Sequence, residues 1–238
     1  MAAPEKSKDL APSSVDYVVT AVKASLGIVP FAGSLLAELA GTLIPNQRID
    51  RLTKFATVLE EKFAKMEQAF IRSQLSNENF TDLLEEGLRQ AARSLTDERR
   101  EYIASLIANS LSSKDIEYLE SKHLLRLLGE INDLEVIWLR FYLNPTNSGD
   151  REYREKHKGV LSPIHAHLGS EQEEVDKATI QESYKEHLVR LDLLAPSYRI
   201  DRKTGFPEFD ARSGRMKMQS YTLTRLGRLL LQCLELTT

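Results

Sequence analysis

Apolar residues recur at helical spacing over most of the chain, and the breaks between these runs predict its elements. Thr96 stands at one such start, with Asp97 and Glu98 following in the first turn, as expected of a helix N-cap. Asn132 with Glu135 three residues later is a capping-box pattern. Five helices follow from these signals, over residues 77–93, 97–111, 114–131, 133–143 and 171–194. The pattern therefore predicts a mostly α-helical chain.

The C-terminal part follows a different pattern. Between Tyr198 and Tyr221 apolar and polar residues alternate, and turn signals occur around Gly205 and Gly214, so two or three short strands are expected there. Thr224 then caps a last helix. A helix, a small β-hairpin and a closing helix form a winged-helix-like arrangement, a variant of the helix-turn-helix plan.

The longest apolar region covers residues 15–44, and Gly27 and Pro30 divide it into two short helices, which predicts an apolar helical hairpin. Gly33, Ala37 and Gly41 recur every four residues, and such a stripe of small residues lets another helix approach closely. The hairpin is either buried in a soluble helical core, or it enters a membrane or self-assembles. Glu38 favours burial in protein, because a lone carboxylate is costly in lipid.

A heptad pattern follows the apolar region. One series spaced by seven is Ile49, Ala56, Phe63 and Phe70, and the interleaved series is Leu52, Leu59 and Met66. Three heptads of this kind are typical of a short coiled-coil helix. The alternatives are a helix that packs inside a local bundle and a seam between two chains, in which Leu59 and Phe63 would be central.

These elements divide the chain into four predicted segments. They are an apolar helical hairpin with a heptad helix (1–75), a central helical domain (76–145), a loop (146–170) and a winged-helix-like module with a small β-hairpin (171–238).

Composition adds the charge distribution to this picture. The chain of 238 residues is 42% hydrophobic and 28% charged, with one cysteine, Cys233, which excludes a disulfide framework. The net charge of −3 is uneven, since residues 196–238 hold eight Lys or Arg against four Asp or Glu. Four arginines near the two turns form a predicted basic wing, namely Arg199, Arg202, Arg212 and Arg215. A basic wing suits a phosphate backbone or an acidic protein surface.

The sequence contains no recognisable motif of a catalytic site. The strings typical of nucleotide-binding, metalloprotease and α/β-hydrolase sites are absent from the sequence. His157, His165 and His167 lie near one another in a charged segment, but a metal site needs three or four ligands with good geometry. We therefore predict no catalytic residue, no cofactor and no metal site, and a non-enzymatic protein.

Two blocks of the sequence resemble the bacterial abortive infection alpha family. The first block is Ala91 to Pro145, and its matching positions are Leu106, Ala108, Asn109, His123, Leu127 and Leu128. The second is the closing stretch, and its matching positions are Leu188, Leu191, Leu193, Leu194, Tyr221, Leu223, Thr224, Gly227 and Cys233. The resemblance covers about 110 residues and leaves out the apolar hairpin and the heptads, and most of its matching positions are helix-core leucines. It implies a role in defence against phage, with no catalytic residues to carry over.

The sequence thus supports two functional hypotheses. The first is an antiviral abortive-infection protein of the bacterial cytoplasm, which forms homo-oligomers and contacts the inner membrane peripherally through residues 14–45, in response to a phage or host trigger that the sequence does not name. The alternative is a DNA-binding winged-helix regulator that dimerises through the heptad helix. Nucleic acid is the less favoured partner, because the chain outside residues 196–238 is acidic and the helix over 171–194 is not basic.

Overall fold

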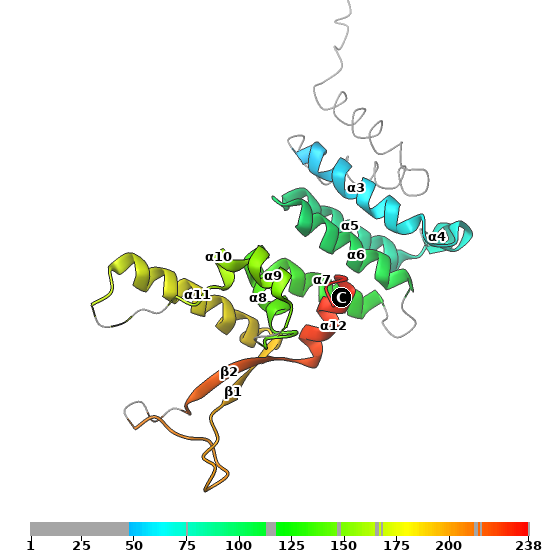
Figure 1. The fold of residues 1–238 in the computed structure, drawn as a ribbon. Coiled ribbons are helices and arrows are strands. Elements are labelled where there is room, and N and C mark those ends of the chain that lie inside the picture. Colours follow the sequence, from blue (N-terminus) through cyan, green and yellow to red (C-terminus); the bar gives the residue numbers. More distant parts are fainter. Residues whose placement is uncertain are drawn as a thin grey trace, which may run out of the picture. The chain divides into compact units, whose positions relative to one another are not determined.

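The structure of the chain, a computed structural model, describes residues 48–74, 76–112, 118–146, 149–164, 167, 169–211, 214 and 216–237. These residues form ten helices and one two-stranded antiparallel sheet (Figure 1), so the prediction of a mostly α-helical fold is confirmed. The chain divides into two compact units, residues 1–125 (unit 1) and residues 126–238 (unit 2).

Unit 1 is built from helices that pack through apolar faces. Its described helices are α3 (Ile49–Phe63), α4 (Gln68–Gln74), α5 (Glu78–Arg93), α6 (Asp97–Ser112) and the first part of α7 (Tyr118–Glu130). Helix α3 packs against both α5 and α6, and α5 packs against α6 (Figure 1). The largest side chains that these helices bury completely are Phe55, Phe63 and Phe80. The segments predicted over 1–75 and 76–145 thus share one core.

The heptad positions of α3 belong to this core. Leu59 and Phe63 are 0% and 1% exposed, on a helix that packs against α5 and α6. The helix ends at Phe63, and Phe70 lies on the separate helix α4 with 40% of its surface exposed. Helix α3 therefore packs inside a local bundle, which was one of the two alternatives. The heptad pattern does not correspond to a single helix that reaches Phe70.

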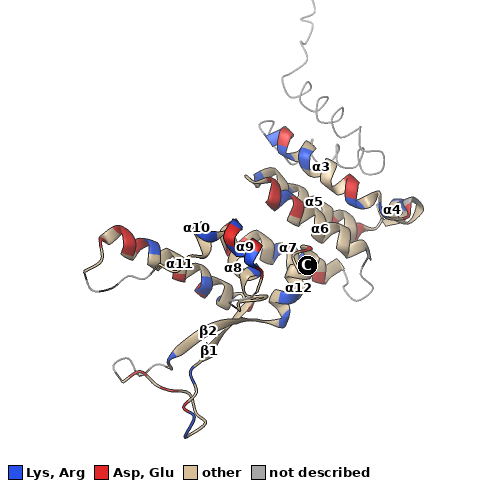
Figure 2. Cartoon of the chain, in the orientation of Figure 1, with Lys and Arg blue, Asp and Glu red and all other residues tan. Residues whose placement is uncertain are grey.

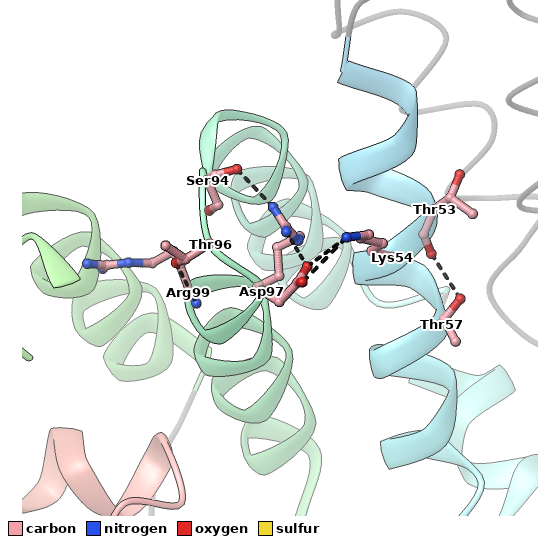
Figure 3. Close-up of polar contacts among 8 residues, drawn as sticks. Thr53, Lys54, Thr57, Ser94, Thr96, Asp97 and Arg99 are labelled. Atoms are coloured by element: carbon pink, nitrogen blue, oxygen red, sulfur yellow. Dashed lines mark hydrogen bonds and ion pairs between the residues drawn. The ribbon is translucent and has the colours of Figure 1, made fainter. Parts of the chain in front are cut away.

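Polar contacts hold the start of α6 beside α3 (Figure 3). The Thr96 hydroxyl accepts a hydrogen bond from the Arg99 N–H at 3.2 Å, which confirms the predicted cap. Asp97 forms an ion pair with Lys54 at 3.2 Å and another with Arg100. The Arg100 guanidinium also donates to the Ser94 carbonyl at 2.9 Å. The contacts of Arg100 and then of Lys54 lower the pKa of Asp97, because they favour its charged form.

Unit 2 contains the remaining helices and the sheet. Its helices are α8 (Asp133–Phe141), α9 (Arg151–Lys156), α10 (Lys158–Leu161), α11 (Gln172–Arg190) and α12 (Arg225–Cys233). The predicted capping box of α8 is confirmed, since the Asn132 side chain accepts from the Glu135 N–H at 2.9 Å and Glu135 accepts from the Asn132 N–H at 2.7 Å.

The segment 146–170, which is predicted to be a loop, contains the two short helices α9 and α10. Asp150 begins α9 by accepting a hydrogen bond from the Tyr153 N–H at 3.1 Å. Helix α9 is polar and α10 is a single turn, so neither leaves an apolar period that a sequence pattern can detect. Gln181 of α11 fixes the end of α10 by donating to the Val160 and Ser162 carbonyls at 3.1 and 2.9 Å.

The sheet of unit 2 is a hairpin that leads away from the helices (Figure 1). Strand β1 (Leu194–Tyr198) pairs with β2 (Met218–Leu223), with Leu194 opposite Leu223. We refer to residues 194–223 as the hairpin and to residues 199–217 as the hairpin tip. Two isolated bridges continue the pairing inside the tip, one between Ile200 and Pro207 and the other between Phe209 and Met216.

The base of the hairpin is closed by Thr224. Its hydroxyl donates to the Asp192 carbonyl at 2.6 Å and accepts from the Gly227 N–H at 2.9 Å, which confirms the predicted cap of α12. Gly227 lies so close to the Leu193 carbonyl that a Cβ atom would overlap it. The first turn of α12 is therefore fixed against the start of β1.

Two large apolar residues of the helices are exposed. Leu119 of α7 is 73% exposed and Ile180 of α11 is 51% exposed. Leu119 is five residues from the buried Leu124, which places the two about 140° apart around a helix. On α11 the only buried residue is Leu188, near the C-terminal end of the helix. Helix α11 is therefore buried near one end only.

Candidate functional site

The predicted site residues fall into three groups. Gly33, Ala37 and Gly41 lie outside the described residues, as do Arg212 and Arg215. Leu59 and Phe63 lie in the core of unit 1, where they have a packing role. Arg199 and Arg202 lie on the hairpin tip and are exposed, as the basic-wing prediction requires. Of the predicted surface sites, the structure therefore describes only the hairpin, with Arg199 and Arg202.

Three backbone segments meet at the start of the tip. The Arg199 N–H donates to the Lys217 carbonyl at 2.9 Å, the Glu208 N–H donates to Arg199 at 2.8 Å, and the Lys217 N–H donates to Glu208 at 2.7 Å. The side chains repeat this connection, because the Glu208 carboxylate lies 4.0 Å from the Arg199 guanidinium and 3.6 Å from the Lys217 ammonium. Glu208 therefore joins two cations and three chain segments.

Two tight turns extend from this junction. The Gly205 N–H donates to the Asp201 carbonyl at 2.8 Å, and the Gly214 N–H donates to the Asp210 carbonyl at 2.9 Å. Both glycines have positive φ, 73° and 65°, in the left-handed region that glycine adopts without a steric penalty. The turn signals at Gly205 and Gly214 in the sequence therefore correspond to real turns.

The tip exposes large apolar side chains. Phe206 is 71% exposed and Phe209 is 60% exposed. Ile200 and Met216 of the tip are 40–50% exposed, as is Met218, the first residue of β2. We refer to these five residues as the apolar tip patch. Sequence reasoning missed the patch because it interpreted the alternation as the faces of strands. The available signal was the position of Phe206 and Phe209 beside turn residues, where no strand face can bury them.

Charge distinguishes the tip from the helix that precedes it (Figure 2). The tip contains six Lys or Arg and three Asp or Glu, a net charge of +3. Helix α11 contains five Asp or Glu and three Lys or Arg. Within the tip, Glu208 is paired with cations, and Asp201 accepts a hydrogen bond from the Lys203 N–H at 2.7 Å. Its acidic side chains are thus engaged locally, whereas Arg202 and Lys203 are exposed.

An aromatic cluster fixes the hairpin to the helices of unit 2. The Lys185 ammonium lies 5.5 Å from the centre of the Trp138 ring and 5.6 Å from that of Tyr221. Glu182 forms an ion pair with Lys185 and accepts a hydrogen bond from the Tyr221 hydroxyl. Tyr142 contacts Tyr221 edge to face, with ring centres 5.9 Å apart. The cluster joins α8, α11 and β2.

The chemistry of this cluster is structural. Burial raises the pKa of Tyr142 and of Tyr221, so both phenols stay protonated at neutral pH. Lys185 is paired with Glu182, and its ammonium makes cation–π contacts with the aromatic rings, so it acts as a packing group. The cluster therefore holds the base of the hairpin in place. No sequence pattern indicates this cluster, because its members come from separate elements.

A hydrogen bond joins the start of α8 to the C-terminal part of α11. The Glu135 carboxylate is 3% exposed and lies 2.6 Å from His187 Nδ1. Its second oxygen accepts the Asn132 N–H of the capping box. Both oxygens of Glu135 thus have partners, which assigns this residue a packing role.

An open hollow of about 430 Å³ lies between α11 and the hairpin. Its lining residues are Glu186, Val189, Arg190, Pro196, Met218 and Tyr221. The ionisable residues among them are Glu186, Arg190 and Tyr221, and the Tyr221 hydroxyl donates its hydrogen bond to Glu182 of the aromatic cluster. Met218 belongs both to this hollow and to the apolar tip patch.

The described residues give findings on the histidines and on membrane-spanning helices. No group of three or more His, Cys, Asp or Glu side chains in the described part of the chain is placed to hold a metal ion. His157 packs on the Tyr153 ring, and His165 lies outside the described residues. None of the helices that the structure describes combines the length and the apolar character needed to cross a bilayer.

Comparison with known proteins adds no relative, since no family model, no curated protein and no solved structure matches the chain.

Proposed function

We propose that this chain is a non-enzymatic phage-defence protein of the abortive-infection type, which acts by contact with another macromolecule through its hairpin. The observation that carries the proposal is the apolar tip patch, where Phe206 and Phe209 are 71% and 60% exposed on a basic segment. Several large apolar side chains left exposed on one segment suit an interaction surface. The defence role rests on the sequence resemblance in the central helices and the closing stretch.

The arrangement of unit 2 supports a winged-helix-like module. Helix α11 leads through the left-handed residue Asp192, with φ of 57°, directly into β1. The hairpin then returns to Thr224 and α12. This order of helix, hairpin and closing helix is that of the winged-helix plan, in which the hairpin is the wing. Winged modules that bind proteins or membranes need no basic helix, which agrees with the acidic composition of α11.

Self-assembly and a second contact belong to the same proposal. Residues 14–45, with the stripe of Gly33, Ala37 and Gly41, are proposed to drive assembly or to contact the inner membrane. Leu59 and Phe63 have no part in this assembly, because they fill the core of unit 1.

A phage-plating assay tests the proposal. Bacteria that express the wild-type chain should reduce plaque numbers for at least one phage of a broad panel. The double variant Phe206→Ser with Phe209→Ser should lose this protection, while its expression and its thermal midpoint stay unchanged. Leu95→Ser is the matched control, because Leu95 is 81% exposed on the loop before α6. Full protection by the double variant, or none by the wild type against any phage of the panel, overturns the proposal.

Duplex DNA is the second candidate partner, favoured by the exposed Arg199, Arg202 and Lys203 of the tip. Against it stand the five carboxylates of α11, the helix that would enter the major groove. A gel-shift titration with random-sequence duplex separates the two. We expect no measurable retention at physiological salt. Sub-micromolar retention that falls steeply with salt, and whose salt slope decreases in Arg212→Glu with Arg215→Glu, would favour the regulator.

A further inference from the structure

We infer that the hairpin tip is a peripheral membrane contact, which inserts its exposed phenylalanines into an anionic lipid surface. The inference rests on the proposed function, because it names the partner of the contact made by the hairpin. It differs from the contact predicted for residues 14–45, since it depends on other residues and on described geometry.

The apolar tip patch has the composition of an interfacial anchor. Phe206 adjoins the turn at Gly205, Ile200 pairs with the neighbouring Pro207, and Phe209 pairs with Met216 in the second bridge of the tip. Phenylalanine and other apolar side chains insert about 5–10 Å into the boundary between lipid headgroups and acyl chains. The backbone junction at Arg199, Glu208 and Lys217 already orders the segment. Insertion therefore does not require the tip to fold first.

Charge complementarity identifies the surface as anionic. The tip has a net charge of +3, and the carboxylates of Asp201 and Glu208 are engaged inside it. Arg202 and Lys203 are exposed and adjoin Phe206 in the sequence. Each cation near an anionic membrane surface strengthens partition about fivefold. Apolar insertion and cationic attraction thus act on the same 19-residue segment.

The shape of the patch favours lipid over a protein or a nucleic acid. Ile200, Phe206, Phe209 and Met216 stand on the turns and extended segments of the tip, and of the five patch residues only Met218 lines the hollow beside α11. A bilayer accepts such side chains without a matching surface. Base stacking uses aromatic faces, whereas Ile200, Met216 and Met218 contribute aliphatic surface.

Vesicle flotation of the full chain is the first test. The wild type should float with vesicles of phosphatidylcholine and phosphatidylglycerol in a ratio of three to one, and at least tenfold less with phosphatidylcholine alone. Phe206→Ser with Phe209→Ser should lower the partition at least tenfold. Arg202→Glu with Lys203→Glu should lower it by a similar factor, and high salt should remove only the part that the cations supply.

Two matched controls keep this test specific. Leu95→Ser removes an exposed apolar side chain from unit 1, and Arg151→Glu with Lys156→Glu makes the same charge change at two exposed positions of α9. Both controls should retain at least half of the wild-type partition. An equal loss in the controls would assign the binding to general charge and hydrophobicity and would overturn the inference.

A local fluorescence readout distinguishes the tip from residues 14–45. The chain has one tryptophan, Trp138, which is 5% exposed, so a Phe206→Trp variant adds one solvent-exposed indole. Anionic vesicles should shift its emission to the blue, and lipids brominated on the acyl chains should quench it. An emission that stays unchanged while the protein floats places the contact elsewhere and overturns the inference.

The outcomes also separate this inference from the proposed function. Protection against phage that depends on Phe206 and Phe209, without vesicle binding, supports the function and rejects lipid as the partner. Tip-dependent vesicle binding by a chain that protects against no phage supports the lipid contact and rejects the defence role. Tip-dependent binding of single-stranded DNA without vesicle binding, measured by fluorescence anisotropy, would replace the lipid with a nucleic acid.

Discussion

Two phenylalanines illustrate how differently the two units use apolar side chains. Phe63 of α3 is 1% exposed in a core shared with α5 and α6, whereas Phe209 of the hairpin tip is 60% exposed. The same side chain therefore stabilises the fold in unit 1 and is available to a partner in unit 2. Exposure in the fold, rather than residue type, separates a packing residue from a candidate binding residue.

The largest expected effect is the loss of the buried ring. Phe63→Ala should lower the free energy of unfolding by about 3–5 kcal/mol, because it removes apolar burial and leaves a cavity. Phe209→Ala should change it by about 0.5 kcal/mol or less, as expected of an exposed position. Urea denaturation followed by circular dichroism measures both. Equal costs for the two substitutions would contradict the assignment of one ring to a core and the other to a surface.

A smaller effect is expected where backbone packs against backbone in unit 2. Gly227→Ala should destabilise by about 1–3 kcal/mol, because the new Cβ would overlap the Leu193 carbonyl, which cannot move without disturbing the start of β1. Gly87→Ala in unit 1 meets only the end of the Ile107 side chain, so it should cost less. The matched control is Gly159→Ala, which has open space around the new atom. It should be neutral or should stabilise by up to about 1 kcal/mol.

Alkaline pH should weaken unit 2 through its buried phenols. Burial, followed by the hydrogen bond to Glu182, raises the pKa of Tyr221 above its ordinary value. The unfolded chain releases this proton near pH 10, so the stability gained from the protonated phenol is present below about pH 10 and is lost as the pH rises further. Tyr221→Phe should show a shallower loss between pH 9 and 11 in urea titrations. An identical slope in both proteins would show that Tyr221 does not titrate with folding.

Acidic pH should lower the stability of unit 1, and this is the smallest of the four predicted effects. The hydrogen bond from Arg100 and then the contact with Lys54 lower the pKa of Asp97 below its ordinary value of 3.8. The stability that this carboxylate contributes is therefore present above about pH 4 and is lost as the pH falls through the lowered folded value. Asp97→Asn should have a lower urea midpoint than the wild type at pH 7, and the two should converge below pH 3. Glu98→Gln, in the same exposed turn, controls for charge at the helix start.

Local sequence determined the helix starts of both units. Thr96, Asn132 and Thr224 cap helices as their positions predict, because a cap depends on residues within one turn. The turns at Gly205 and Gly214 follow from glycine for a similar local reason. Helices α9 and α10 were not predictable in this way, since their few turns carry no apolar period.

Only the tertiary structure decided which apolar residues are covered. The heptad pattern identified Leu59 and Phe63 as a buried face, but a face has no partner until distant helices pack on it, and α5 and α6 supply that partner here. The hairpin shows the opposite case, because Phe206 and Phe209 have an ordinary strand-like pattern and no described element covers them. The contacts of Lys185 with Trp138 and Tyr221 likewise join three elements that are separate in the sequence. Sequence determines local conformation and the apolar face of each element, whereas burial is a property of pairs of elements and depends on the whole chain.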